Sequence, residues 1–138
     1  MTALLTLERS LQLGRLCSSI LEIDKKIQLV VIINQRGRII EKKMRDDWAT
    51  KDLIDQKKEM LFMGCALQIS MSHDFDPEFG TVRYTFMERK TMTIFSFPLA
   101  EDMVVVISEP NITPISFGKK ITKIIEDRKT RIKQVILN

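Results

Sequence analysis

Cysteine, histidine, proline and glycine are all scarce in this chain of 138 residues, and each scarcity excludes a class of protein. Two cysteines cannot build a disulfide scaffold, and one histidine leaves little for a metal site. Four prolines and five glycines are too few for a fibrous or low-complexity chain. No apolar run approaches the roughly 20 residues of a membrane-spanning helix. These absences leave an ordinary globular protein that folds without covalent or metal crosslinks.

Hydrophobic residues make up 44% and charged residues 29% of the chain, which is the balance of a globular domain. No repeat, linker or low-complexity tract interrupts it, so we expect residues 1–138 to form a single domain. Cys17 and Cys65 stand among apolar neighbours, which favours small core residues of a reduced, cytoplasmic protein. The first residues also lack the cationic stretch that opens a signal peptide.

Positive charge is concentrated towards the C-terminus. The formal net charge is +4 at pH 7, and residues 112–138 alone hold seven basic and two acidic side chains. Two interpretations stay open: the solvated face of a helix, or a surface that binds the phosphates of nucleic acid or an anionic membrane. The candidate anion-binding residues are those off the apolar stripe of the predicted helix: Lys119, Lys120, Lys123, Arg131 and Lys133.

Hydrophobic periodicity predicts the helices and strands. Apolar residues at spacings of three and four predict a first helix within residues 1–24, and Gly14 shifts its expected start to near Ser10. A β-branched apolar run over Ile27–Ile33 predicts a buried strand that turns at Asn34–Gly37. The remaining predicted elements are a strand over 38–42, a helix over 50–72 capped by Thr50, strands over 81–87, 91–97 (ended by Pro98) and 103–108, and a helix from Thr113-Pro114.

This order of elements, αββαβββα, indicates an α+β fold with a five-stranded antiparallel sheet and helices on both faces. Within the strand over 81–87, simple alternation places Val82, Tyr84 and Phe86 on one face.

The middle helix carries the most informative pattern. From Met60 to Met71 only Gln68 and Ser70 are polar, whereas a helix that packs on one sheet face needs a single apolar stripe. We therefore expect a second cover, most simply the same helix of another copy in a twofold dimer. The alternative is an ordinary core helix covered by another helix of the same chain.

The element order and the turn Asn34-Gln35-Arg36-Gly37 resemble the roadblock/LC7 family of profilin-like folds over residues 10–138. The chain also resembles small archaeal proteins without an assigned activity, in the segments 20–24, 59–63, 80–84 and 97–99. The roadblock resemblance implies a homodimer whose interface would use Met60, Met63, Gly64, Leu67, Met71, Val82, Tyr84 and Phe86. It also implies regulation or scaffolding of a protein partner, with a small GTPase as one class, and no catalytic residues. The last helix is longer and more basic than this resemblance leads us to expect.

Catalytic chemistry finds little support in the residues. His73 lies near Asp74 and Asp76, which fits a solvated loop better than a metal or acid–base cluster. The chain has no metalloprotease, phosphate-loop or nucleophile-elbow motif, and an apolar setting would raise the pKa of Cys65. Trp48 either staples the middle helix to the sheet or anchors a partner. No catalytic residue, cofactor or metal is expected.

The sequence thus favours a non-enzymatic homodimer that binds a protein partner. Two other classes stay open: a PAS-like or other profilin-like sensor of a small ligand, and a nucleic-acid-associated protein that uses the basic last helix.

Overall fold

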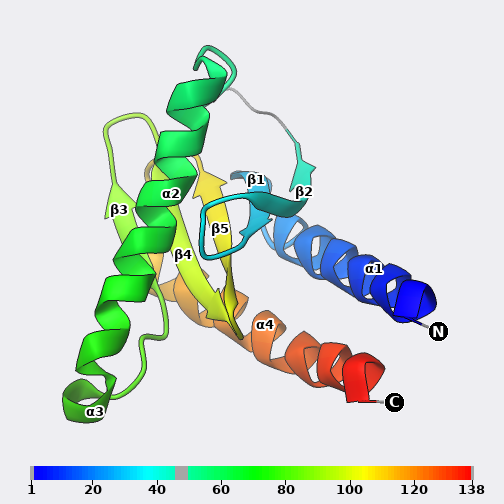
Figure 1. Cartoon of the computed structure of the whole chain (residues 1–138). Helices are drawn as coiled ribbons and strands as arrows, with labels where there is room; N and C mark the ends of the chain where they lie inside the picture. The colour runs from blue at the N-terminus through cyan, green and yellow to red at the C-terminus, as the bar shows by residue number, and fades with distance from the viewer. Residues whose placement is uncertain (1, 46–49, 138) are drawn as a thin grey trace.

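The computed structural model describes the backbone of residues 2–45 and 50–137, with side chains described at 3–45 and 50–129. Figure 1 shows the elements in their chain order. They are α1 (Thr2–Leu21), β1 (Ile27–Ile33), β2 (Ile39–Met44), α2 (Asp55–Ser72), the 3₁₀ turn η1 (His73–Phe75), α3 (Asp76–Phe79), β3 (Thr85–Glu88), β4 (Thr93–Leu99), β5 (Asp102–Ser108) and α4 (Pro114–Leu137).

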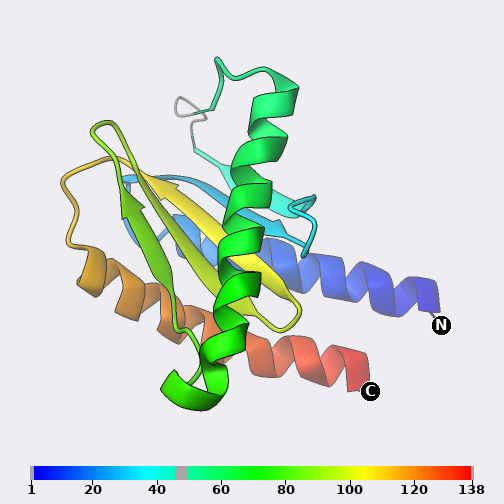
Figure 2. The ribbon, with the colours of Figure 1, turned by 60° about the vertical axis from the view of Figure 1, so that its left-hand side comes forward.

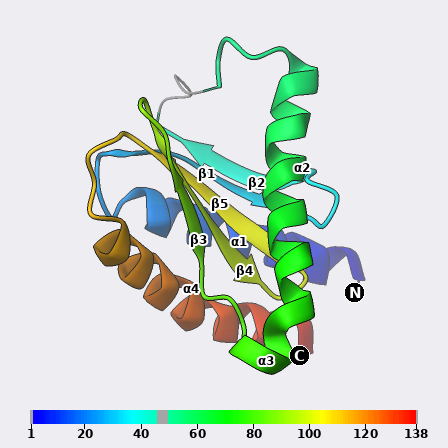
Figure 3. The same ribbon diagram turned by 90° about the vertical axis from the view of Figure 1, so that its left-hand side faces the viewer.

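The sheet has the predicted five antiparallel strands, in the order β2-β1-β5-β4-β3. Helices α1 and α4 lie side by side on one face, and α2 crosses the other face (Figures 2 and 3). The α+β architecture expected from the sequence is therefore confirmed. Of the helices in the described residues, none is both long enough and apolar enough to span a membrane.

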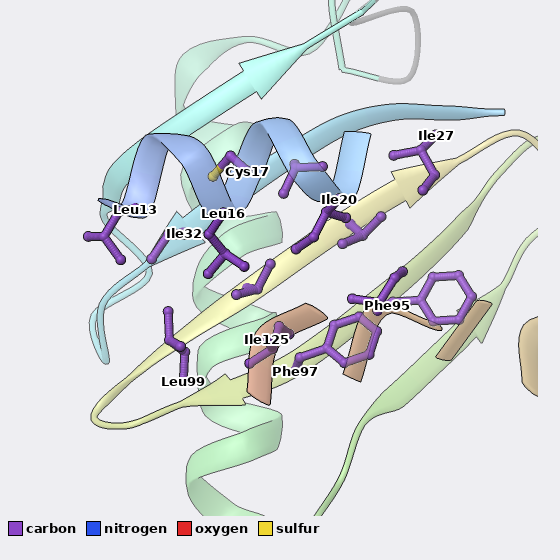
Figure 4. Packing of buried hydrophobic residues seen from close by; sticks show 14 of the residues in the cluster. Leu13, Leu16, Cys17, Ile20, Ile27, Ile32, Phe95, Phe97, Leu99 and Ile125 are labelled. Atoms are coloured by element: carbon purple, nitrogen blue, oxygen red, sulfur yellow. The ribbon is translucent and has the colours of Figure 1, made fainter. Parts of the chain in front are cut away.

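The strands β1 and β5 lie at the centre because their β-branched side chains suit burial on both faces. One apolar cluster fills the space between the sheet and the pair α1 and α4 (Figure 4). Its members include Leu16 and Ile20 of α1, Phe95 and Phe97 of β4, and Ile121 of α4. A second cluster lies under α2 on the opposite face.

Helix α1 begins at Thr2, so the prediction of a start near Ser10 is wrong. Contacts made by the fold outweigh the low helix propensity of Gly14. The guanidinium of Arg9 donates to the carboxylate of Asp102 at 3.2 Å, and the hydroxyl of Ser10 donates to Glu41 at 3.3 Å. The helix ends at Leu21, before the predicted limit of residue 24.

The predicted strands are present, but several limits differ. The strand expected over 81–87 is shorter, because β3 pairs with β4 only from Thr85 opposite Ser96 to Glu88 opposite Thr93. Pro98 does not end β4, which continues to Leu99. Beyond Ser96, β4 has no β3 partner, so the missing N–H of Pro98 breaks no bond of that ladder.

The start of the middle helix also differs from its prediction. Thr50 is not the cap: its carbonyl accepts a hydrogen bond from the Leu53 N–H at 3.0 Å within a turn. The helix begins at Asp55, whose carboxylate lies in the first turn where the helix dipole favours negative charge. It ends at Ser72 as predicted, and η1 and α3 follow in place of a simple turn.

Candidate protein interface on the α2 face

Helix α2 is apolar on two sides, and the sheet covers only one of them. Phe62, Ala66 and Ile69 are buried against the sheet. On the outer side, four residues form what we call the α2 ridge: Met60, Gly64, Leu67 and Met71. Met60, Leu67 and Met71 are 66%, 53% and 69% exposed. The ridge residues and the exposed Met63 are the five helix residues that the roadblock/LC7 resemblance implies for a dimer interface.

The turn between β1 and β2 holds α2 in place. Gly37 has a φ of +79°, and a Cβ there would lie 2.6 Å from the backbone N and Cα of Met63. The side-chain oxygen of Asn34 accepts hydrogen bonds from the N–H groups of Arg36 at 2.9 Å and Arg38 at 3.1 Å. The sequence predicts this turn, but its contact with α2 depends on tertiary packing that local pattern does not contain.

Two hollows lie on opposite sides of α2, and a third, of about 260 Å³, lies where Ala66, Ile69 and Ser70 of the helix face the turn between β4 and β5. The β3 groove, of about 320 Å³, lies between α2 and β3 and is lined by Met60, Leu61, Gly64, Cys65, Gln68, Thr85, Met87, Arg89, Ile94 and Ser96. The β2 groove, of about 650 Å³, lies on the other side of the helix beside the β1–β2 turn. Met63 and Leu67 line the β2 groove, whereas Met60 and Gly64 line the β3 groove. The exposed apolar residues of α2 therefore line two different hollows.

Residues of the predicted strand 81–87 do not share one face, which corrects the expectation from alternation. Val82 packs with the cluster under α2, whereas Tyr84 packs with the cluster under α1 and α4. The Tyr84 and Phe97 rings lie 5.6 Å apart, and the Phe86 and Phe95 rings 6.0 Å. Alternation fails because regular strand geometry begins only at Thr85.

Strand β3 adds an open edge to this surface. It lies at the end of the sheet, where its described residues pair with β4 on one side. Phe86 and Met87 are both nearly half exposed. Met87 lines the β3 groove and was absent from the sequence prediction. An unpaired edge beside an uncovered helix is a surface suited to pairing with another chain.

The two cysteines have the inert environments expected of them. Burial raises the pKa of the Cys17 thiol from 9.0 to about 12, and the carboxylate of Glu41 adds to the rise. Burial likewise raises the pKa of Cys65, although a side-chain hydrogen bond with Ser96 opposes it. A thiol with a raised pKa holds little nucleophilic thiolate at neutral pH.

The segment around His73, predicted to be a loop, is helical (η1 and α3), and the His73 ring makes a local hydrogen bond. Its Nδ1 lies 3.1 Å from an Asp76 carboxylate oxygen, three residues along the chain. Among the side chains described at 3–45 and 50–129, no three histidine, cysteine or acidic groups gather as metal ligands would.

The basic residues of α4 lie on the opposite side of the sheet from α2. Lys119, Lys120 and Lys123 are exposed, and Arg83 joins Lys119 and Lys123 around a hollow of about 340 Å³. The side chains of Arg131 and Lys133, and the whole of Trp48, lie outside the described residues. Anion binding by this helix stays a prediction.

Comparison with solved structures defines the class of fold. The roadblock/LC7 domain from Streptomyces avermitilis matches with a TM-score of 0.65 and 11% identity, covering 87% of this chain and 97% of that one. Myxococcus xanthus MglB matches at 0.65 with 15% identity, over 89% of this chain and 88% of its own. MglB in a tetrameric arrangement matches at 0.69 with 12% identity, over 92% of each chain. The chain therefore has the roadblock/LC7 fold, as the sequence resemblance indicates.

The sequence itself assigns the family within this fold. Residues 12–133 match DUF6659, described as a family of unknown function, and the chain belongs to that family. A search of the curated protein sequences finds no match.

Proposed function

We propose that this protein is a non-enzymatic homodimeric scaffold that uses the α2 ridge and the β3 edge to pair with a second copy and so present a platform to a protein partner. The observation that carries this proposal is the α2 ridge, an apolar helix face that no described residue covers. A twofold axis beside one helix brings the same patch of both copies together, so one apolar ridge is sufficient for a closed dimer.

The composition of the ridge supports a helix-to-helix contact. No described residue would lie within 4 Å of a Cβ at Gly64, so the fold of one copy has no need of a glycine there. A glycine in mid-helix costs about 1 kcal/mol relative to alanine. Close approach of a second helix is a physical reason why a glycine stands here despite that cost. The flexible methionines on either side adapt to such a surface.

One solved structure with this fold supports self-association. One MglB structure with this fold has a tetrameric arrangement. From the roadblock/LC7 resemblance, we propose a small GTPase as the class of partner. In the dimer, Val82 would border the seam on the α2 side of the sheet, and Tyr84 and Phe86 would border it on the other side.

Solution mass tests the proposal. Light scattering after size exclusion should give about twice 16.0 kDa for the parent. Met60→Lys, which places two cations across the proposed twofold contact, should give a monomer. Ile115→Lys is the matched control, because Ile115 is an equally exposed apolar residue at the start of α4. A monomeric parent, or a Met60→Lys variant that stays dimeric, would overturn the proposal.

A further inference from the structure

The β2 groove combines an apolar floor with a cationic rim. Its apolar lining comes from Ile39, Phe62, Met63 and Leu67, and its basic lining from Arg36, Arg38 and Lys58. Glu59 is its one carboxylate among the described lining residues. With about 650 Å³, it is larger than the β3 groove on the other side of α2.

The cations on this rim are available to a partner. In the described part of the chain, Arg9 pairs with Asp102 and the His73 ring contacts the Asp76 carboxylate, so neither contact involves the groove. On the far side of the turn, Arg36 and Arg38 share a shallow hollow with Glu101 and Asp102, and Asp102 is already paired. Among its described lining residues, the β2 groove therefore carries three basic side chains against one carboxylate.

The backbone that presents two of these cations is fixed. The side chain of Asn34 binds the N–H groups of Arg36 and Arg38, and Gly37 between them packs directly on Met63. A preorganised turn loses little conformational freedom when a partner binds, which favours recognition at this position.

We infer that the β2 groove docks a short segment of a partner protein that carries acidic and apolar side chains together. Carboxylates of the segment would pair with Arg36, Arg38 and Lys58, while its apolar side chains would cover Met63 and Ile39. The mixed lining favours a peptide over nucleic acid, because phosphates use the cations and leave the apolar floor uncovered. This inference rests on the proposed scaffold role but not on dimerisation. The ridge residues Met60 and Gly64 lie towards the opposite groove, and the docked segment would use Met63 and Ile39, which lie outside the ridge.

Selection from an unbiased peptide library tests the inference. The full chain is immobilised and challenged with 12-residue peptides randomised at every position. The enriched sequences should combine aspartate or glutamate with apolar residues, and their binding should weaken as salt rises. Affinity should fall about tenfold or more in Arg36→Glu/Arg38→Glu, whose exposed side chains carry no described contact of the fold. Ile39→Ser should weaken the same peptides by loss of the apolar floor.

A charge-matched control separates the groove from the overall charge. Lys25→Glu/Lys120→Glu changes the net charge by the same amount at exposed positions outside the groove, and peptide affinity should remain at the parent value. No enrichment, or acidic peptides that bind the Arg36→Glu/Arg38→Glu variant as well as the parent, would overturn the inference. So would a 20-base-pair DNA duplex that bound the parent in place of the peptides and lost affinity in that variant.

The outcome is distinguishable from that of the dimer. Met60→Lys should give a monomer that retains peptide affinity, because it lies outside the β2 groove. A dimeric parent without peptide binding removes the groove assignment alone, and a monomeric parent with peptide binding removes the dimer alone.

Discussion

The two faces of the sheet are packed in different ways. Helices α1 and α4 close one face over a cluster in which Leu16, Ile20 and Ile121 are fully buried (Figures 3 and 4). Among the described long helices, α2 is the one that covers the other face, with a groove on each side and an exposed apolar ridge. A closed face contributes stability, whereas an open apolar face retains area for binding. We therefore expect the first face to contribute most of the stability, and we propose the second face for recognition.

Replacing a leucine by alanine should lower the free energy of unfolding by very different amounts on the two faces, and this is the largest effect that we expect. Leu16→Ala removes a fully buried side chain beneath the paired helices and should lower the free energy of unfolding by about 2–5 kcal/mol. Leu67→Ala on the α2 ridge should change it by less than about 0.5 kcal/mol in a Met60→Lys monomer. Urea denaturation followed by circular dichroism measures both. Equal losses would show that the two faces are packed alike.

Gly37→Ala should separate α2 from the sheet. The alanine Cβ would meet the backbone of Met63 at 2.6 Å, and the φ of +79° is itself unfavourable for alanine. We expect a loss of about 2 kcal/mol or more, with faster amide hydrogen exchange in α2 than in α1. Gly14→Ala is the control, because a Cβ there makes ordinary contact at 3.9 Å. Uniform exchange across both helices would contradict a local role for Gly37.

Alkaline pH should weaken the closed face through Cys17. Its folded pKa of about 12 lies above the ordinary 9.0, so the folded chain keeps a proton that the unfolded chain releases between these values. Stability should therefore fall as pH rises from about 9 to 12, by up to about 1.4 kcal/mol per pH unit from this group. Cys17→Ala should show a shallower slope in denaturation curves across this range. Parallel slopes for parent and variant would exclude this contribution.

The sequence predicts those parts of the fold that depend on local pattern. The β-branched runs over Ile27–Ile33 and 103–108 predict the central strands because burial on both faces demands them. Met60–Met71 predicts a helix with apolar residues on two sides, and the structure leaves one side uncovered. These features belong to contiguous residues, so periodicity alone reveals them.

Features that depend on tertiary contacts could not be predicted in this way. Thr81–Tyr84 has strand-like alternation but lies beyond the β3–β4 ladder. The β2 groove joins Arg36 and Arg38 of a turn with Lys58 of a helix about twenty positions away, and only the folded chain brings them together. The two arginines around a glycine mark the turn as a candidate binding element. The α2 residues that complete the groove cannot be inferred from the local sequence.

The smallest expected effect on stability provides the sharpest test of the open face. Gly64→Ala should raise the stability of the isolated fold by about 0.5–1 kcal/mol, because alanine favours helix and no described residue meets its Cβ. Measured in a Met60→Lys monomer, this gain is free of any dimer contribution. In the otherwise unchanged chain, the same Cβ would stand between two closely packed helices and should raise the dimer dissociation constant about tenfold or more. Sedimentation across a concentration series measures that constant. A purely structural role for Gly64 cannot explain a substitution that stabilises the monomer and weakens the dimer. If Gly64→Ala stabilised both the monomer and the dimer, the twofold contact would lie away from this position.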